Sequence, residues 1–245
     1  MEKIFLIFLS LSLFTNNLFG QDIDKMSAEK IIEESVDRLW GPYKGWTEEG
    51  TISIVFEKNN IKSFEIKRYV RMLEKETKIR IDISDGNKVL ISCSNDGINI
   101  WVKLPGSEKV RRFNTNFSNY FGTTSITYED VWRFLGVGEN SKNFDYKIFS
   151  QTNEIICIKA ESKIESGYDS RLISITKKDF SVQKIQYFLN GEIIKDQENE
   201  IQIKDKHWTI TNSTIFDLKE KKRTKISITK KDFSVKGNVF KKENL

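Results

Sequence analysis

The chain has 245 residues, of which 38% are hydrophobic and 31% are charged, and its net charge is +5. It is long enough to bury a substantial core, and its charge is too weakly positive to indicate a nucleic-acid partner. With two prolines and no Ser/Gly-rich linker, the sequence predicts one domain over residues 21–245.

The N-terminus has the layout of a secretory signal peptide over residues 1–20. Lys3 precedes an apolar run from Ile4 to Phe14, and Gly20 marks a small-residue cleavage site. A membrane anchor is the alternative, but the run is shorter than the roughly 20 residues that span a bilayer. We therefore expect an exported mature chain without a transmembrane segment.

Two helices are predicted. Ser27 is positioned to cap a helix that ends at Trp40 and carries an apolar stripe. Thr127 is positioned to cap a second, short helix through Leu135, with Asp130 at its third helical position and Gly136 at its end.

Most of the remaining chain predicts antiparallel sheet. Asp85-Gly86, Asp96-Gly97 and Asn190-Gly191 lie between alternating or apolar runs, and such dipeptides favour tight hairpin turns. Around them apolar residues recur at every second position, as at Ile98, Ile100 and Val102. The pattern predicts a meander with one apolar face.

The decapeptide ISITKKDFSV occurs twice, at residues 173–182 and 226–235. In both copies isoleucine alternates with Ser and Thr before Lys-Lys-Asp. The identity predicts two equivalent strand-turn units, and two copies are too few for a repeat array.

Basic residues gather near the C-terminus, at Lys219 to Arg223 and at Lys241-Lys242. A solvated strand face and a frayed tail explain them, with contact to an anionic membrane as the less favoured alternative.

Residues suited to catalysis or metal binding are few. His207 is the only histidine, and Cys93 and Cys157 lie far apart, so the usual metal-ligand spacings are missing and a disulfide between the two cysteines stays open. Glu48-Glu49 and Glu129-Asp130 are adjacent carboxylates that solvation and helix-end charge explain. We expect a protein that is not an enzyme and that has no cofactor or metal.

Aromatic residues are more numerous than two short helices need for packing on a sheet. Each alone is explained by the core, but a curved sheet covered by few helices leaves an apolar space. The stretch from Trp101 to Trp132 joins a strand, a turn, a basic pair and the capped helix.

This stretch resembles the LolA-like outer-membrane lipoprotein-sorting proteins. The resemblance covers residue 28 to the C-terminus, and its motifs are Leu104-Pro105, Arg111-Arg112, Phe121, a turn at residues 123–125 and Tyr128-Glu129-Asp130. The family has Gly-Ser-Asp where this chain has Thr123-Thr124-Ser125, so a carboxylate is missing from the turn.

The resemblance implies a mainly β (α+β) fold, in which a curved antiparallel sheet forms an incomplete barrel around a hydrophobic cavity. It implies a monomeric periplasmic carrier that passes the acyl chains of lipoproteins or lipids toward the outer membrane. An inner-membrane transporter and an outer-membrane acceptor would be its protein partners. A periplasmic sensor or accessory domain of a membrane protein, without cargo transport, is the alternative, and an unidentified hydrolase is a weaker one.

Residues 127–135 and the loop before them are the candidate lid. Arg111 and Arg112 are candidates for contact with a lipid head group or a partner. The candidate cavity and lid residues are Trp40, Trp46, Phe56, Trp101, Phe113, Phe121, Tyr128, Val131, Trp132, Phe134 and Leu135.

Overall fold

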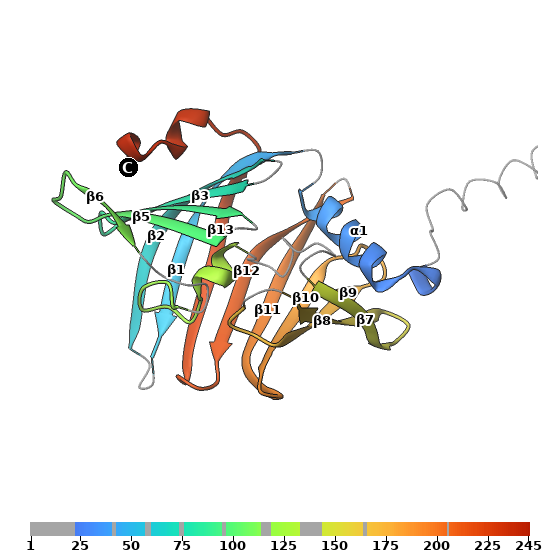
Figure 1. The fold of residues 1–245 in the computed structure, drawn as a ribbon. Coiled ribbons are helices and arrows are strands. Elements are labelled where there is room, and N and C mark those ends of the chain that lie inside the picture. The colour runs from blue at the N-terminus through green and yellow to red at the C-terminus, as the bar shows by residue number, and fades with distance from the viewer. Residues whose placement is uncertain are drawn as a thin grey trace, which may run out of the picture.

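One curved antiparallel sheet dominates the protein, as a computed structural model shows (Figure 1). The strands are β1 Gly45–Val55, β2 Ile61–Met72, β3 Glu76–Ile83, β4 Lys88–Ser94, β5 Gly97–Lys103, β6 Val110–Phe113, β7 Phe144–Gln151, β8 Ile155–Ser162, β9 Ser170–Thr176, β10 Val182–Leu189, β11 Glu192–Lys204, β12 His207–Asp217 and β13 Lys222–Asp232. The structure describes residues 23–40, 43–56, 60–73, 76–94, 97–113, 119–132, 144–163, 166–204 and 206–245. The predicted signal peptide lies outside these residues.

The helices are few and short. They are α1 Ala28–Trp40, α2 Tyr128–Trp132, and the 3-10 turns η1 Ile23–Lys25, η2 Gly237–Phe240 and η3 Lys242–Asn244. Within the described ranges, no helix is long and apolar enough to cross a membrane. The predicted mainly β fold with a curved, open antiparallel sheet is thereby confirmed.

The strand order follows the chain except at one place, where β1 pairs with β13. The order is β6-β5-β4-β3-β2-β1-β13-β12-β11-β10-β9-β8-β7. The antiparallel register of this pair shifts between Glu49 and Gly50, as at a β-bulge. A Cβ atom on Gly50 would lie 2.0 Å from the carbonyl oxygen of Ser227, so only glycine allows this approach.

Helix α1 closes one end of the concave side (Figure 1). The Ser27 hydroxyl accepts a hydrogen bond from the Lys30 amide at 3.3 Å, as a helix cap does, and this confirms the predicted start. Ile31 is fully buried in the core, and the Trp208 indole of β12 donates to the Ser35 carbonyl at 3.0 Å. His207 contacts the Arg38 carbonyl at 3.1 Å through Nδ1, so it has a structural contact.

Hairpin turns form at the predicted dipeptides where the structure describes them. Asn190 and Gly191 have φ values of 53° and 79°, the conformation that a two-residue hairpin loop requires. Gly86 also has a positive φ, of 92°. Asp96 of the third dipeptide lies outside the described residues. No disulfide joins Cys93 of β4 to Cys157 of β8, and the Cys157 thiol lies 3.6 Å from the Ser174 hydroxyl.

The two decapeptide copies are not equivalent, and that prediction was wrong. Residues 173–182 end β9, turn at Lys177 and start β10, whereas residues 226–232 continue as the single strand β13. In the first copy the Thr176 hydroxyl bonds to Asp179. In the second the matching hydroxyl, that of Thr229, donates to the Glu49 carbonyl of β1 at 3.1 Å. The neighbouring strand β1 therefore determines that the second copy continues as a strand where the first copy turns.

Candidate functional site

A cavity of about 580 Å³ lies between the concave face of β1 to β6 and the segment from Asn119 to Tyr128. This volume falls within the range of about 300–1,000 Å³ that ligand pockets occupy. Its walls are mostly aliphatic and aromatic side chains, with polar residues at the strand ends. The lining residues are Ile52, Ile54, Lys62, Phe64, Ile66, Ile83, Asp85, Asn87, Val89, Val102, Leu104, Phe113, Asn119, Tyr120, Phe121, Gly122, Thr123, Thr124 and Tyr128.

The alternation of side chains along the strands builds this lining. In β1 every second residue from Trp46 to Ile54 is buried, which is the pattern of a strand with one face toward a core. The strand register then sets Ile52 beside Phe64 and Ile66 beside Ile83. Neighbouring strands thus present their apolar residues to one continuous surface.

Residues 119–128 close the cavity as a compact loop. Tyr120 and Thr127 form an antiparallel bridge, and the Phe121 amide donates to the Ile126 carbonyl at 2.8 Å. The Thr124 hydroxyl donates to the Phe121 carbonyl at 2.6 Å. The rings of Phe121 and Tyr128 meet edge to face with centroids 5.7 Å apart. The loop therefore offers the cavity an aromatic wall.

Helix α2 begins in a reciprocal capping arrangement, as predicted. The Asp130 amide donates to the Thr127 hydroxyl at 3.2 Å, and the Thr127 amide donates to the Asp130 carboxylate at 2.7 Å. The described part of the helix ends at Trp132, and the predicted continuation to Leu135 lies outside the described residues.

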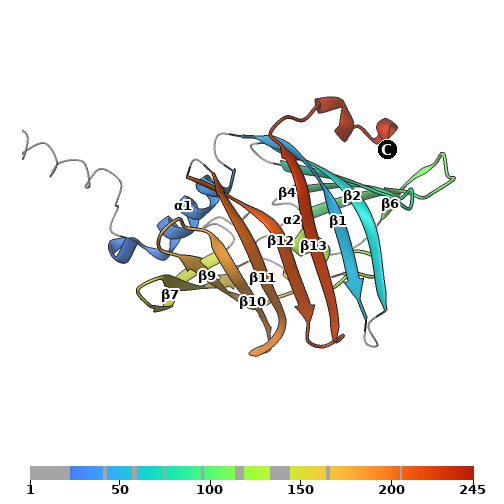
Figure 2. The same cartoon turned by 180° about the vertical axis from the view of Figure 1, so that it is seen from behind.

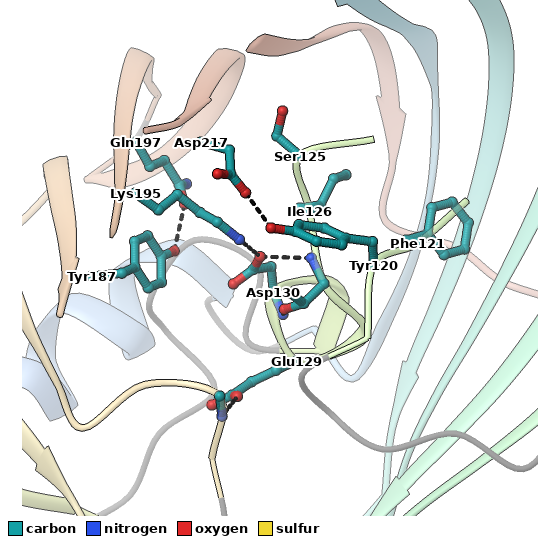
Figure 3. A network of polar contacts seen from close by, with 12 residues as sticks. Tyr120, Phe121, Ser125, Ile126, Glu129, Asp130, Tyr187, Lys195, Gln197 and Asp217 are labelled. Atoms are coloured by element: carbon teal, nitrogen blue, oxygen red, sulfur yellow. Dashed lines mark hydrogen bonds and ion pairs between the residues drawn. The ribbon is translucent and has the colours of Figure 1, made fainter. Parts of the chain in front are cut away.

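Buried ion pairs fasten α2 to the far half of the sheet (Figure 3). The Lys195 ammonium of β11 lies 2.7 Å from the Asp130 carboxylate, and the Tyr168 hydroxyl donates to the same group at 2.9 Å. Phe121 points away from this pair in Figure 3. One short segment thus faces the cavity on one side and a buried charge network on the other.

Glu129 makes the second buried ion pair. Its carboxylate lies 2.6 Å from the Arg171 guanidinium of β9 and accepts from the Ser166 hydroxyl at 2.6 Å and the Gly167 amide at 2.7 Å. The guanidinium carbon lies 5.4 Å from the ring centroids of Tyr168 and Tyr187, a distance at which a cation and a ring attract.

Electrostatics keep Asp130 charged although it is buried. Burial opposes ionisation of Asp130, but the charge and hydrogen bond of Lys195 together hold its pKa below the ordinary value. Burial, followed by the charge of Asp130, raises the pKa of Tyr168 well above its ordinary value. The tyrosine is therefore a neutral donor, suited to positioning and not to proton transfer near neutral pH.

The prediction that solvation and helix-end charge explain Glu129-Asp130 and Glu48-Glu49 was wrong about solvation for three of these carboxylates, whereas Asp130 does cap α2. Glu129, Asp130 and Glu48 are buried, and Glu48 pairs with Arg68 and, at 3.3 Å, with Lys231. Only Glu49 is partly exposed. Their basic partners lie 20 residues or more away in the sequence, so no local pattern identifies the pairs.

A second apolar cluster lies on the outer face of the sheet. Trp101 packs there with Leu90 against Phe240 and Leu245 of the C-terminal segment. The Lys242 ammonium lies 4.2 Å from a Trp101 ring centroid, and the Arg80 guanidinium donates to the Asn244 carbonyl at 2.6 Å. The C-terminal segment therefore covers Trp101 from outside.

Residues 61–245 match a family model that is described only as an uncharacterized protein. The chain belongs to this family. Among solved structures, an outer membrane lipoprotein-sorting protein domain from Vibrio parahaemolyticus has a TM-score of 0.76 at 16% identity, over 88% of this chain and 96% of that one. Among curated proteins no match was found.

Two more solved structures share the fold. A DUF1329 family protein from Desulfovibrio piger gives a TM-score of 0.75 at 17% identity, over 89% of this chain and 98% of the other. A LolA superfamily protein from Nitrosomonas europaea gives 0.68 at 12% identity, over 90% and 100%. The fold is therefore LolA-like, and the resemblance in the sequence is confirmed at this level.

Three of the predicted site residues line the cavity of this LolA-like fold, namely Phe113, Phe121 and Tyr128. Trp46 lies in the core, Phe56 is 39% exposed at the end of β1, and Trp101 does not face the cavity. The side chains of Trp40, Val131, Trp132, Phe134 and Leu135 lie outside the described residues.

Arg111 and Arg112 are exposed on the edge strand β6, where Arg112 donates to Asn99 at 2.6 Å. In the described ranges, no group of three or more His, Cys, Asp or Glu residues is arranged to hold a metal ion.

Sequence reasoning missed the part of the cavity lining that comes from β1 to β3, including Ile52, Phe64 and Ile83. The signal was present, because alternation assigns each of them to the apolar face of its strand. The same alternation excludes Trp101 from the cavity lining, because Ile100 and Val102 on either side of it face the core.

Proposed function

We propose that the protein is a periplasmic carrier that binds the acyl chains of lipoproteins or lipids in this cavity and passes them toward the outer membrane. The observation that carries the proposal is the apolar cavity of about 580 Å³ under residues 119–128. The LolA-like fold supports it, because a sheet that curves around a cavity is suited to enclosing a hydrocarbon chain.

The physical need for such a carrier is large. Each methylene group that enters water costs about 0.8 kcal/mol, so a long acyl chain does not cross an aqueous gap alone. The apolar wall of β1 to β5 supplies the burial. The proposal has no catalytic step, and the neutral tyrosines beside Asp130 serve to position charge.

The route of export supports the location. Residues 1–20 have the composition of a signal peptide, and export through it would bring the mature chain to the aqueous space between two membranes. Acyl chains have to be shielded in that space. An inner-membrane donor and an outer-membrane acceptor are the partners that this route requires.

The lid would be the loop of residues 119–124 alone, and α2 would stay in place when it opens. Moving α2 away would separate Asp130 from Lys195 and Glu129 from Arg171, and breaking one buried pair costs about 3–5 kcal/mol. The loop ahead of it is held mainly by its own hydrogen bonds and by contacts to β12 and β13. It can therefore open at lower cost.

A substitution that fills the cavity tests the proposal. Ile83→Trp adds bulk to a half-buried residue of the lining, and excluding about three methylenes should weaken acyl-chain binding roughly 50-fold. Binding of a fluorescent fatty acid, and native mass spectrometry of gently purified protein, measure the effect.

Ser63→Trp is the matched control, because it places the same side chain on the exposed outer side of the neighbouring strand β2. Its affinity for the fatty acid should equal that of the wild type. Protein that is purified empty, and whose binding is the same in Ile83→Trp, would contradict the proposal. Crosslinking in cells to a single membrane protein, with no lipoprotein, would favour the accessory-domain alternative.

A further inference from the structure

The hairpin turns at one end of the sheet carry exposed apolar residues. Leu218 lies on the turn between β12 and β13, Leu189 ends β10 just before its turn into β11, and Ile61 starts β2 at the same end. Their exposed fractions are 38%, 38% and 65%. The two turns form the lower edge of the sheet in Figures 1 and 2. Exposed apolar side chains beside basic ones are the combination that binding to a membrane interface uses.

Basic residues lie beside two of these apolar residues, Leu218 and Ile61. Lys219, Lys221 and Arg223 are exposed on the β12–β13 turn, and Lys62 is exposed at the start of β2. Glu220 is the exposed acidic residue of that turn, and Asp217 is buried and accepts from the Tyr120 hydroxyl at 2.5 Å. Positive charge therefore predominates on the β12–β13 turn, whereas the β10–β11 turn has the exposed acidic residues Asp169 and Glu192 beside it.

The basic turn is continuous with the mouth of the cavity. Lys62 lines the cavity, and the Lys222 ammonium lies 5.0 Å from the Tyr120 ring centroid. The Ser125 hydroxyl donates to the Lys222 carbonyl at 3.0 Å. The loop that closes the cavity is thus in direct contact with the turn that carries the positive charge.

We propose that this end, defined by Ile61, Lys62, Leu189 and residues 218–223, docks on the surface of a bilayer that contains anionic lipid. The leucines and isoleucine enter the interface, and the basic side chains bind the lipid phosphates. Docking sets the cavity mouth against the bilayer, so that an acyl chain passes between them without crossing bulk water. The inference rests on the proposed function and names the surface through which the cavity exchanges lipid.

Vesicle binding tests the docking surface separately from the cavity. The probes are vesicles of phosphatidylcholine alone and of phosphatidylcholine with phosphatidylglycerol, in sedimentation assays at low and high salt. The full chain should bind the anionic vesicles, and salt should weaken the binding. The triple variant Lys219→Gln, Lys221→Gln and Arg223→Gln should bind on the order of 100-fold more weakly.

The matched control removes the same charge from the opposite end of the sheet. Lys178, Lys236 and Lys241 are exposed there, and their replacement by Gln should change vesicle binding less than about threefold. Equal weakening by both triples, or no binding of wild type to anionic vesicles, overturns the inference. The variant Ile61→Ser with Leu218→Ser should weaken binding to both vesicle types, and unchanged binding would also count against it.

A failure of the docking surface can be distinguished from a failure of the proposed carrier function. The Lys219/Lys221/Arg223 variant should bind a fluorescent fatty acid with wild-type affinity, because none of its substitutions lines the cavity. Fatty-acid binding without vesicle binding overturns the docking surface alone. Vesicle binding that depends on these residues, with no fatty-acid binding, supports the docking surface and contradicts the carrier.

Discussion

The two halves of the concave face are built from strands of similar kind and filled in different ways. Over β1 to β6 the face is aliphatic and borders a cavity of about 580 Å³. Over β8 to β12 it is covered by α1 and by a network of buried charges and tyrosines around Lys195 and Arg171. One half is therefore packed solid, while the other borders the cavity in which we propose that the acyl chain binds.

Residues 119–132 lie at the boundary between these halves. Phe121 and Tyr128 face the cavity, whereas Glu129 and Asp130 bind the filled half. Adjacent carboxylates in the sequence thereby fix the position of the wall that closes the cavity.

Removing the charge of Asp130 should give the largest effect. Asp130→Asn leaves the Lys195 ammonium buried without its counter-charge, so the free energy of unfolding should fall by about 3–5 kcal/mol in urea titrations. Hydrogen exchange of residues 119–130 should increase at the same time. The control Glu33→Gln breaks an exposed pair on α1 and should cost less than about 0.5 kcal/mol. Equal losses in both variants would show that the network does not hold the filled half.

The same pair gives a stability that depends on pH. The pKa of Asp130 lies below its ordinary value of 3.8, because Lys195 outweighs the opposing effect of burial. A carboxylate with a depressed pKa stabilises the fold above the unfolded-state pKa, and this contribution is lost as the pH falls through the folded-state value. Stability of the wild type should therefore decline below about pH 4. Asp130→Asn should decline less steeply, and a parallel decline would contradict the assignment.

Truncating isoleucines in the two halves should give a smaller and unequal pair of effects. Ile173 is fully buried in the filled half, so Ile173→Ala should cost about 3–4 kcal/mol in unfolding free energy. Ile83 is half-buried beside the cavity, and Ile83→Ala should cost about 1 kcal/mol because fewer contacts are lost. If the two substitutions lower the unfolding free energy equally, the cavity side is packed as tightly as the filled side.

The smallest expected effect compares the two decapeptide copies. Asp179, in the filled half, accepts from Ser181 at 3.0 Å and bonds to Thr176, so Asp179→Ala should cost about 1–2 kcal/mol. Asp232 makes the matching bond to the Ser234 amide at 3.0 Å but is exposed, and Asp232→Ala should cost about 0.5 kcal/mol or less. Thermal unfolding measures both variants. Equal shifts of the unfolding temperature would mean that the difference in burial does not make the two aspartates differ in their contribution to stability.

Local patterns predicted the local features of this fold. The Ser27 and Thr127 caps, the Asn190-Gly191 turn and the alternating strands follow from residues within a few positions of one another. The antiparallel meander and its apolar face were predicted for the same reason, whereas the incomplete barrel was implied by the resemblance to the LolA-like proteins.

The features that could not be predicted depend on contacts between residues that are distant in the sequence. Glu129 is buried because Arg171 faces it from β9, and residues 230–232 continue a strand because β1 pairs with them. Trp101 faces outward because its neighbours face the core, and the cover that it receives comes from the last ten residues of the chain. No local pattern carries these pairings.

The pairing of β1 with β13 has a consequence for how the chain is made. β1 needs residues 223–232 as its partner, and β13 is synthesised after every other strand of this sheet. Until then β1 presents an unpaired edge, which is a site for wrong association between chains. The sheet is thus completed by its most distant contact, a topology that folds slowly. A chain truncated before residue 222 would leave both β1 and β12 as open edges and should aggregate.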